Sequence, residues 1–392
     1  MAASKSEKTR RANKKSNSNY KRLGELLSAQ KTAGEVDYAF LFMVILVLIV
    51  GLVMLLSVSA PASSEMYEGK SYWIFLKQLL FTTLGLAVMW VCSRIPYESY
   101  KQWTEWIYVN SVVLLILVMI FGREVNGSKR WLSFFQPSEL AKPAVVLMAA
   151  KYIAMENTDM AKLRIGWVKK YVLIFGLVAL FLMMEPHLSA TMIIFTMMVT
   201  MLCVNGMKLW PVIVMGVPAA GAVGVWIKHR SANRWSRLMR FLSPFEDLQN
   251  SGYQISQSLY SIGSGKLFGL GLGESVQKYG FLPEPYNDFI FAIICEELGF
   301  VGATMIVILF VALILFGMRI AMNAPDTYST MLATGIVTQL AMQTLMNIAV
   351  ATASFPNTGV SLPFFSYGGT SVVTLLAEMG ILLNISRYSK RA

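Results

Sequence analysis

Asp288 is a lone carboxylate at the edge of a long apolar run, in the segment LPEPYNDFIFAIICEELGF that covers residues 282–300. A carboxylate at the start of a membrane segment can act as a general base on a substrate at the interface. The same side chain, or that of Asn287, can instead cap the first turn of a helix, which stabilises it by about 1 kcal/mol. The residues alone favour neither interpretation, and both place the carboxylate at the membrane–water interface.

A second set of ionisable residues lies in the segment QPSELAKPAVV, where Glu139 and Lys142 stand three residues apart. That spacing puts both side chains on one face of a helix, and Pro137 suits the first helical position. An ionisable group inside a membrane costs several kcal/mol unless it is paired or hydrated, so each one is a candidate site residue. A structural ion pair explains these two equally well. The basic stretch GSKRW just before them, with Lys129 and Arg130, favours an anion-binding site.

The segment MMEPHLSA interrupts two short apolar runs and carries Glu185 and His187. A proline turn with a hydrogen-bonded histidine explains it, and so does a functional kink at membrane depth. Both interpretations stay open. The other ionisable residues in or beside apolar runs are Lys77, Glu105, Glu296, Glu297 and Glu378.

Basic residues also gather in a long loop near 228–288: Lys228, Arg230, Arg234, Arg237, Arg240, Lys266 and Lys278. Long loops cross membranes despite their charge, so a solvated surface is one explanation. The other is an extracytoplasmic anion, because the planar fork of arginine binds phosphate with two hydrogen bonds. The stretch GSGKLFGLGLGES in this loop lacks the Ser or Thr that follows the lysine of a nucleotide-binding P-loop. Its glycines indicate turns that let a ligand approach the backbone.

Metal and disulfide chemistry find little support in the sequence. The chain has two histidines and three cysteines, and Cys92, Cys203 and Cys295 lie far apart in or beside apolar runs. No CxxC or CxxH spacing occurs, so neither a zinc site nor a disulfide framework is indicated. We expect these cysteines to be small buried apolar residues.

The elements that position these residues are membrane helices. Of the 392 residues, 55% are hydrophobic and 14% charged, and the apolar residues come in long unbroken runs. This pattern predicts an all-α polytopic integral membrane protein, with about 20 apolar residues for each crossing. About ten transmembrane helices are expected, near residues 38–60, 73–93, 104–121, 137–154, 171–185, 189–205, 209–227, 289–317, 328–350 and 368–386.

The distribution of basic residues orients these helices. Residues 1–37 carry nine Lys or Arg and no apolar run, which predicts a disordered basic cytoplasmic tail that contacts anionic membrane lipids or partner proteins. The net charge of +12 would suggest nucleic acid in a soluble protein, but here much of it flanks membrane segments and sets their orientation. Residues 38–392 form the transmembrane domain. Both termini are cytoplasmic, and the large extracytoplasmic loop near 228–288 joins helices 7 and 8.

Another extracytoplasmic segment, FPNTGVSLPFFSYGGTS at 355–371, is rich in turn formers and includes Ser366 and Gly368. Irregular backbone at membrane depth persists only where it is packed in protein or lines a hydrated cavity. We therefore expect this segment, residues 122–142 and the long loop to converge on one outward-opening cavity. Such a site suits a substrate with an anionic head and a lipid tail. A polyprenyl pyrophosphate sugar fits, because its pyrophosphate leaves once its charge is neutralised.

Four stretches together resemble the SEDS family of cell-shape, elongation, division and sporulation proteins: NGSKRW with QPSELAK, GYQISQSLYSIGSGKLFGLGLGESVQK, LPEPYNDFIFAIICEELG and PNTGVSLPFFSYGGTS. The resemblance covers nearly all of the chain after the tail. The basic N-terminal extension and the ending LLNISRYSK are most similar to the division and sporulation branches.

The resemblance implies a peptidoglycan glycosyltransferase that polymerises lipid II into β-1,4-linked glycan strands at the outer face of the cytoplasmic membrane. It would release undecaprenyl pyrophosphate and act in septal wall synthesis during cell division, with a sporulation or elongation role as the alternative. The family's essential aspartate corresponds to Asp288, which would take the proton of the attacking GlcNAc 4-hydroxyl. Glu139 and Lys142 would shape the site, and Lys142 with Arg130 would hold the pyrophosphate. Further substrate-binding candidates are Lys129, Arg234, Arg237, Arg240, Lys278, Ser366 and Gly368.

The resemblance also implies partners and a location. A class B penicillin-binding protein, which is a transpeptidase, and other divisome proteins would join this chain at the division septum. No cofactor is implied, and a divalent cation at the pyrophosphate stays open.

Two positions depart from the family pattern. Tyr286 and Asn287 stand where the family usually has His-Thr, and His187 stands where an aspartate usually follows the proline. Two other functions compete with the enzyme. A lipid II flippase would need access from both membrane faces, whereas the polar groups here cluster at the outer one. A non-catalytic divisome scaffold would bind the transpeptidase and leave Asp288 without a chemical role.

Overall fold

Long apolar stretches of this chain form helices that end where turn-forming residues begin. The computed structural model describes residues 34–125, 128–132, 135–156, 165–185, 187–208, 240–246 and 252–389, with the single positions 210, 214, 221 and 229. Nearly all of the expected tail and most of the expected seventh span, at 209–227, lie outside these residues. So do Arg234 and Arg237.

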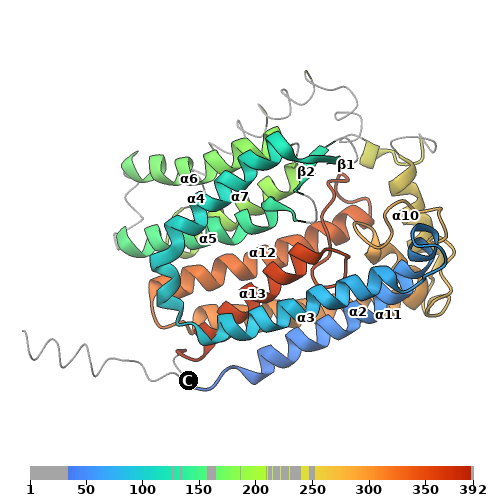
Figure 1. Ribbon diagram of the computed structural model, residues 1–392, viewed down its shortest axis with the longest axis horizontal. Helices are drawn as coiled ribbons and strands as arrows, with labels where there is room; N and C mark the ends of the chain where they lie inside the picture. The colour runs from blue at the N-terminus through green and yellow to red at the C-terminus, as the bar shows by residue number, and fades with distance from the viewer. Residues whose placement is uncertain are drawn as a thin grey trace, which may run out of the picture. The chain divides into compact units, whose positions relative to one another are not determined.

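Ten α-helices are present in the described parts of the chain (Figure 1): α2 (Tyr38–Met66), α3 (Trp73–Arg94), α4 (Tyr97–Phe121), α5 (Pro137–Glu156), α6 (Ile165–Met184), α7 (Leu188–Val204), α10 (Tyr253–Ser264), α11 (Ile290–Met322), α12 (Thr327–Ala351) and α13 (Gly369–Ser386). Five of them, α2, α3, α4, α11 and α13, are long and apolar enough to cross a membrane. A multi-pass membrane protein is therefore confirmed.

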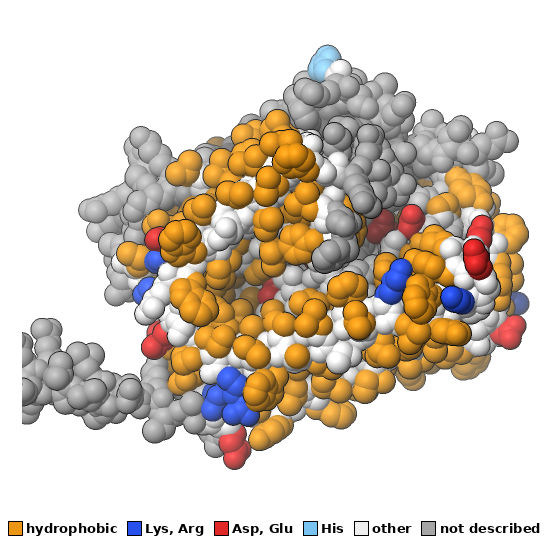
Figure 2. All heavy atoms as spheres, viewed as in Figure 1, with side chains coloured by type: hydrophobic (Ala, Val, Ile, Leu, Met, Phe, Trp, Pro, Cys, Tyr) orange, Lys and Arg blue, Asp and Glu red, His pale blue; other side chains and the backbone are white. Residues whose placement is uncertain are grey.

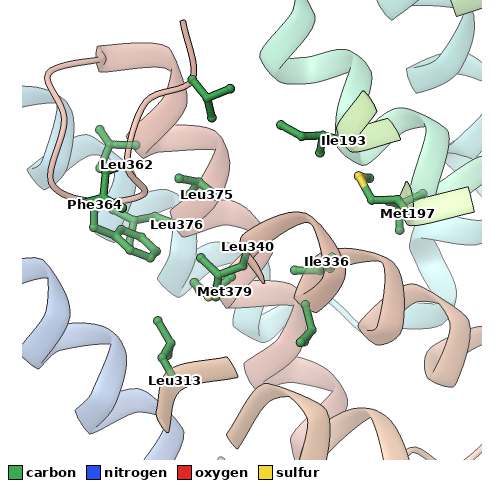
Figure 3. Packing of buried hydrophobic residues seen from close by; sticks show 14 of the residues in the cluster. Ile193, Met197, Leu313, Ile336, Leu340, Leu362, Phe364, Leu375, Leu376 and Met379 are labelled. Carbon is green, nitrogen blue, oxygen red and sulfur yellow. The ribbon is translucent and has the colours of Figure 1, made fainter. Parts of the chain in front are cut away.

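The helices of residues 36–389 pack side by side around an apolar centre. Helix α13 packs along α3, and α12 contacts α5, α7 and α11. Figure 3 shows how side chains from four helices meet there, among them Met197, Leu313, Leu340 and Met379. Hydrophobic side chains also dominate the visible outer face (Figure 2), as expected for helices that have lipid as their solvent.

Helix α11 is interrupted at Gly299, which has φ 68° and ψ −172°. The break frees backbone groups, and the loop after α10 binds them: Leu270 N–H donates to Glu296 O at 2.9 Å, and Phe300 N–H donates to Lys266 O at 2.9 Å. These hydrogen bonds satisfy groups that a membrane would leave unpaired. The glycine-rich loop therefore supports the helix that follows Asp288.

The structure differs from the expected all-α architecture in the connection between α4 and α5. Strands β1 (Arg123–Val125) and β2 (Ser128–Trp131) pair there as a short antiparallel hairpin. A second difference is α10, a helix inside the region expected to be a loop. Strand β2 carries Arg130, and α10 packs against α11, the helix that follows Asp288. Both additions therefore contribute to the positioning of the site.

Candidate active site

Asp288 lies in the turn that leads into α11, and its backbone is held from behind. Asn347 of α12 donates from Nδ2 to Asp288 O at 2.8 Å and to Val360 O at 2.7 Å. The N-cap of α11 is Phe289, and no side chain caps this helix. The capping explanation of Asp288 and Asn287 is therefore wrong. Among the described residues, no hydrogen bond to the Asp288 carboxylate is present, so this group can accept a proton from a bound molecule.

The segment expected to be re-entrant, 355–371, packs against the residues before Asp288 through its part that precedes α13. Tyr367 N–H donates to Tyr286 O at 2.9 Å, and Ser366 Oγ donates to Asn287 O at 2.5 Å. Gly368 N–H in turn donates to Gln78 Oε1 at 3.1 Å. Ser366, predicted as a substrate-binding residue, thus binds the turn that carries Asp288, and Gly368, predicted for the same role, binds α3.

Gly359 brings the same segment to the carboxylate itself. A Cβ on this residue would lie 3.3 Å from Asp288 Oδ2 and 3.7 Å from Arg130 Nη1. Its φ of +68° also belongs to the left-handed region that favours glycine. Asp288 Oδ2 and Arg130 Nη1 therefore lie near the same point beside Gly359, where the backbone presents no side chain.

The surroundings of Asp288 raise its proton affinity. Burial and the negative charge of Glu284 raise the pKa of Asp288, the positive charge of Arg130 lowers it, and the net value is about 6. Glu284 is held nearby because its Oε2 accepts from Asn287 Nδ2 at 2.6 Å. A carboxylate with this pKa is mostly ionised at neutral pH and is still basic enough to accept a proton.

The predicted pair on α5 is present. Lys142 Nζ lies 2.8 Å from Glu139 Oε1, and both side chains are buried. The charge of Lys142 also acts on His187, and the charge of Arg130 acts on both His187 and Glu185. Glu185 and His187, which lie in the break between α6 and α7, are therefore within electrostatic reach of Arg130. The sequence did not indicate this proximity.

Lys278 has a different role from the one predicted. Its ammonium donates to Glu297 Oε1 at 2.7 Å, to Gly273 O at 2.6 Å and to Ser57 Oγ at 3.4 Å. These three acceptors use all three donors of a lysine, and the residue is only 4% exposed. Lys278 therefore fastens the loop after α10 to α11 and α2, and it has no donor left for a substrate.

The side chains of four other predicted substrate-binding residues are not described by the structure. Arg234 and Arg237 lie outside the described residues, and the structure describes Lys129 and Arg240 by their backbone only. Sequence reasoning missed Gln78 and Asn347, two buried amides that bind the turns around Asp288. A polar amide within an apolar run was the available signal, because such a group needs a partner in the membrane.

The sequence comparisons cover almost the whole transmembrane region. Residues 38–391 match the family model described as cell cycle proteins of the FtsW, RodA and SpoVE type. The chain belongs to this family. It is 37% identical to stage V sporulation protein E of Bacillus subtilis (strain 168) over 361 residues, which cover 90% of this chain and 98% of that protein. It is also 37% identical to a probable peptidoglycan glycosyltransferase FtsW of Coxiella burnetii, with 86% and 93% of the two chains covered.

Solved structures of this family have the same fold. A chain of a peptidoglycan synthase complex that couples polymerisation and crosslinking superposes with a TM-score of 0.76 at 25% identity, covering 90% of this chain and 98% of that one. RodA of Thermus thermophilus superposes with a TM-score of 0.67 at 24% identity, covering 91% and 98%. The family resemblance inferred from the four sequence stretches is confirmed.

Proposed function

We propose that this chain is a peptidoglycan glycosyltransferase that polymerises lipid II at the outer face of the cytoplasmic membrane, with Asp288 as the general base. The observation that carries the proposal is the Asp288 carboxylate: it has no hydrogen-bond partner among the described residues, its pKa is about 6, and Arg130 lies beside it. The FtsW relatives that carry the name of this activity support it.

The chemistry follows from these groups. Asp288 accepts the proton of the GlcNAc 4-hydroxyl as that oxygen attacks the anomeric carbon of MurNAc. The new C–O bond forms as the bond to the pyrophosphate breaks, and the electron pair leaves with undecaprenyl pyrophosphate. Direct displacement inverts the α-linked donor into a β-1,4 glycan. The base contributes by proton transfer in the transition state, for which rate factors of about 10² to 10⁴ are typical.

The leaving pyrophosphate requires positive charge close to the base. Arg130 is placed for this work beside Asp288, and Lys142 contributes its charge from α5 while it remains paired with Glu139. Arginine suits this role because its planar fork binds two phosphate oxygens at once. Lys129 and Arg240 remain candidates for the same role on their charge and position in the sequence. Polymerisation with and without EDTA tests whether a divalent cation shares the work.

A lipid II flippase is the main alternative. The experiment that separates the two supplies lipid II to the purified protein in detergent, where no membrane exists to cross, with a class B penicillin-binding protein added as the proposed partner. The enzyme forms glycan strands there, and Asp288→Ala forms none. Translocation of lipid II in liposomes that survives Asp288→Ala, together with no polymer in detergent, would establish the flippase instead.

The biological role that we propose is septal wall synthesis. Names of relatives support a division role, and the similarity to a sporulation protein supports the other branch. The match to a chain of a peptidoglycan synthase complex supports a penicillin-binding protein as partner. Fluorescently tagged protein imaged through division and spore formation separates the roles: recruitment to every septum supports division, and recruitment only to the spore envelope supports sporulation.

A further inference from the structure

His187 is a buried histidine that the proposed reaction does not use. It is 5% exposed, and its Nδ1 has no hydrogen-bond partner among the described residues. It is also the N-cap residue of α7, although its side chain makes no capping hydrogen bond. A buried polar nitrogen without a partner destabilises the fold, so its position calls for an explanation.

Helix α7 presents its N-terminus at the same place. The backbone N–H groups of the first turn of a helix have no acceptor within the helix, and the helix dipole adds partial positive charge there. In α7 these are the N–H groups of residues 188–190, and no side chain caps them. A helix N-terminus of this kind is a favourable binding site for an anion.

The charges around His187 are arranged for an anion as well. Arg130 from β2 and Lys142 from α5 act on it directly, and Lys142 is paired with Glu139. Burial raises the pKa of Glu185, two residues before, to about 8, although Arg130 opposes this, so that carboxyl is mostly neutral at pH 7. Asp288 Oδ2 and Arg130 Nη1 both lie within 4 Å of the point where a Cβ of Gly359 would be.

The binding groups of α7 also connect to the catalytic turn. Ser189 Oγ donates to Thr358 O at 2.9 Å, and Thr358 directly precedes the glycine that touches both Asp288 and Arg130. A ligand at the start of α7 is therefore linked through one residue to the carboxylate that accepts the proton. This connection joins the start of α7 to the residue that precedes Gly359, whose neighbours are Asp288 and Arg130.

We propose that His187 and the first turn of α7 bind a phosphoryl group of a lipid pyrophosphate, and that His187 takes up one proton from solvent when this anion binds. The inference rests on the proposed function and extends it to the subsite of the leaving group. Release of the product returns the proton to solvent, so the proton balance of each cycle closes.

The free protein favours the neutral imidazole. Burial and the positive charges of Arg130 and Lys142 hold the pKa of His187 well below its usual range. A bound pyrophosphate places negative charge against all three groups and favours the imidazolium. The bound histidine then donates a hydrogen bond from Nδ1 to a charged oxygen, and such bonds are among the stronger ones in proteins.

The test measures binding of polyprenyl pyrophosphate to the purified full-length protein in detergent. Inorganic pyrophosphate is measured beside it, and the polyprenyl alcohol serves as the ligand without phosphate. His187→Leu removes the ring nitrogen, and we expect its Kd to rise roughly tenfold or more. His187→Asn keeps a neutral donor near the position of Nδ1, and we expect a rise of about threefold. His229→Asn changes the chain's only other histidine, an exposed one, and should leave binding unchanged.

A pH series tests the proton uptake. Between about pH 6 and 8 the advantage of the wild type over His187→Asn should shrink as pH rises, because fewer solvent protons are available to the histidine. A constant ratio would overturn the proton uptake. Unchanged affinity in both His187→Leu and His187→Asn would overturn the site. If inorganic pyrophosphate alone showed the effect, the ligand would be a free anion rather than the lipid.

These outcomes are separate from those for the proposed function. If His187 variants bind normally while Asp288→Ala abolishes polymerisation, the enzyme assignment stands and only the subsite fails. If Asp288→Ala polymerises lipid II normally while His187→Leu loses affinity, the subsite stands and the assignment of the base fails. His187→Asn, whose side chain is polar and small, keeps the test valid if His187→Leu unfolds.

Discussion

The carboxylate of Asp288 is prepared for proton transfer by its neighbours rather than by its position at a membrane edge alone. Burial and Glu284 raise its pKa, Arg130 lowers it, and the net value of about 6 lies close to ambient pH. General bases are most effective in this range, because a large ionised fraction is combined with a useful affinity for protons. These surroundings support the proposal that Asp288 is the general base.

The pH dependence of polymerisation follows from this value. Asp288 is active when ionised, and its pKa is above the ordinary value, so the rate should fall as pH decreases through about 6. Glu284→Gln removes a charge that raises the pKa, and it should move the acid limb of the profile to lower pH. Initial rates measured from about pH 4.5 to 8 check both expectations. If Glu284→Gln leaves the acid limb at the same pH, the charge of Glu284 is not a cause of the raised pKa of Asp288.

Gly359 should not tolerate a side chain. Gly359→Ala places a methyl group 3.3 Å from Asp288 Oδ2 at a φ of +68°, so the carboxylate must move or the segment must shift. We expect polymerisation to fall by about tenfold or more, because small misplacements at a reacting centre are costly. The measurement is the initial rate beside the thermal unfolding midpoint.

Gly206→Ala is the matched control. Gly206 also has a positive φ, +94°, but no atom lies within 4 Å of where its Cβ would be. It therefore carries the same kind of backbone penalty without the neighbour, roughly 1 kcal/mol of stability. Equal losses of activity in the two variants would show that the backbone penalty, and not contact with Asp288, is responsible.

Side-chain contacts could be predicted from the sequence where both partners lie on one helix at a spacing that brings them together. Glu139 and Lys142 were expected on one helix face, and they form an ion pair there. Lys278 was assigned from its charge alone, and its three buried partners come from segments far apart in the sequence. No local pattern reveals such partners, which is why charge near a site was a poor guide to contact with a substrate.

At the scale of elements, the turn that carries Asp288 depends on the loop after α10. Glu296 and Glu297 lie near the end of the short helical piece before Gly299, and both accept hydrogen bonds from that loop. Ser275 donates to Glu296 Oε2 at 2.6 Å, and Lys278 pairs with Glu297. These two buried carboxylates are structural, since they hold the loop against α11.

The Lys278 and Glu297 pair should be costly to break on one side only. Lys278→Met leaves a buried carboxylate without its cation, and we expect a loss of stability of roughly 3–5 kcal/mol. The double variant Lys278→Met with Glu297→Gln removes both charges and should recover most of that loss. Thermal unfolding of the single and double variants in one detergent makes the comparison. If the double variant is no more stable than Lys278→Met, the charge of Glu297 is not the cause.

Some helix boundaries were predicted closely, whereas one end of α2, α4, α6 and α11 was missed by about five to seven residues. The expected spans at 328–350 and 368–386 match α12 and α13 within a residue at each end. The expected span at 289–317 continues through Gly299, and hydrogen bonds from a distant loop satisfy the backbone groups at the break.

At the scale of the whole transmembrane unit, the groups of the candidate site come together at one end of the helices. Figure 1 shows β2, α10 and the start of α13 at the end opposite the C-terminus. Most of the basic residues outside the long loop flank the other end, which predicts that it faces the cytoplasm. The site would then face outward, as a substrate displayed on the outer leaflet requires.

Labelling of introduced cysteines tests this orientation. In a background without Cys92, Cys203 and Cys295, Lys70→Cys lies in the connection between α2 and α3, and Lys208→Cys follows α7 at the opposite end; both positions are exposed. A membrane-impermeant thiol reagent should label Lys70→Cys in intact spheroplasts. It should label Lys208→Cys only after permeabilisation. The reverse pattern would invert the topology and remove the site from the outer face.

The measurement that bears most directly on the central claim is polymerisation of lipid II by Asp288→Asn. The amide has nearly the shape of the carboxylate but cannot accept the proton, so the variant should fold like the wild type and form no glycan strands above background. Glu274→Gln, an exposed carboxylate changed in the same way, should polymerise like the wild type. We expect the rate to fall by at least about 10²-fold in Asp288→Asn, the lower end of what a general base contributes. Strand formation by Asp288→Asn at the wild-type rate would contradict the account.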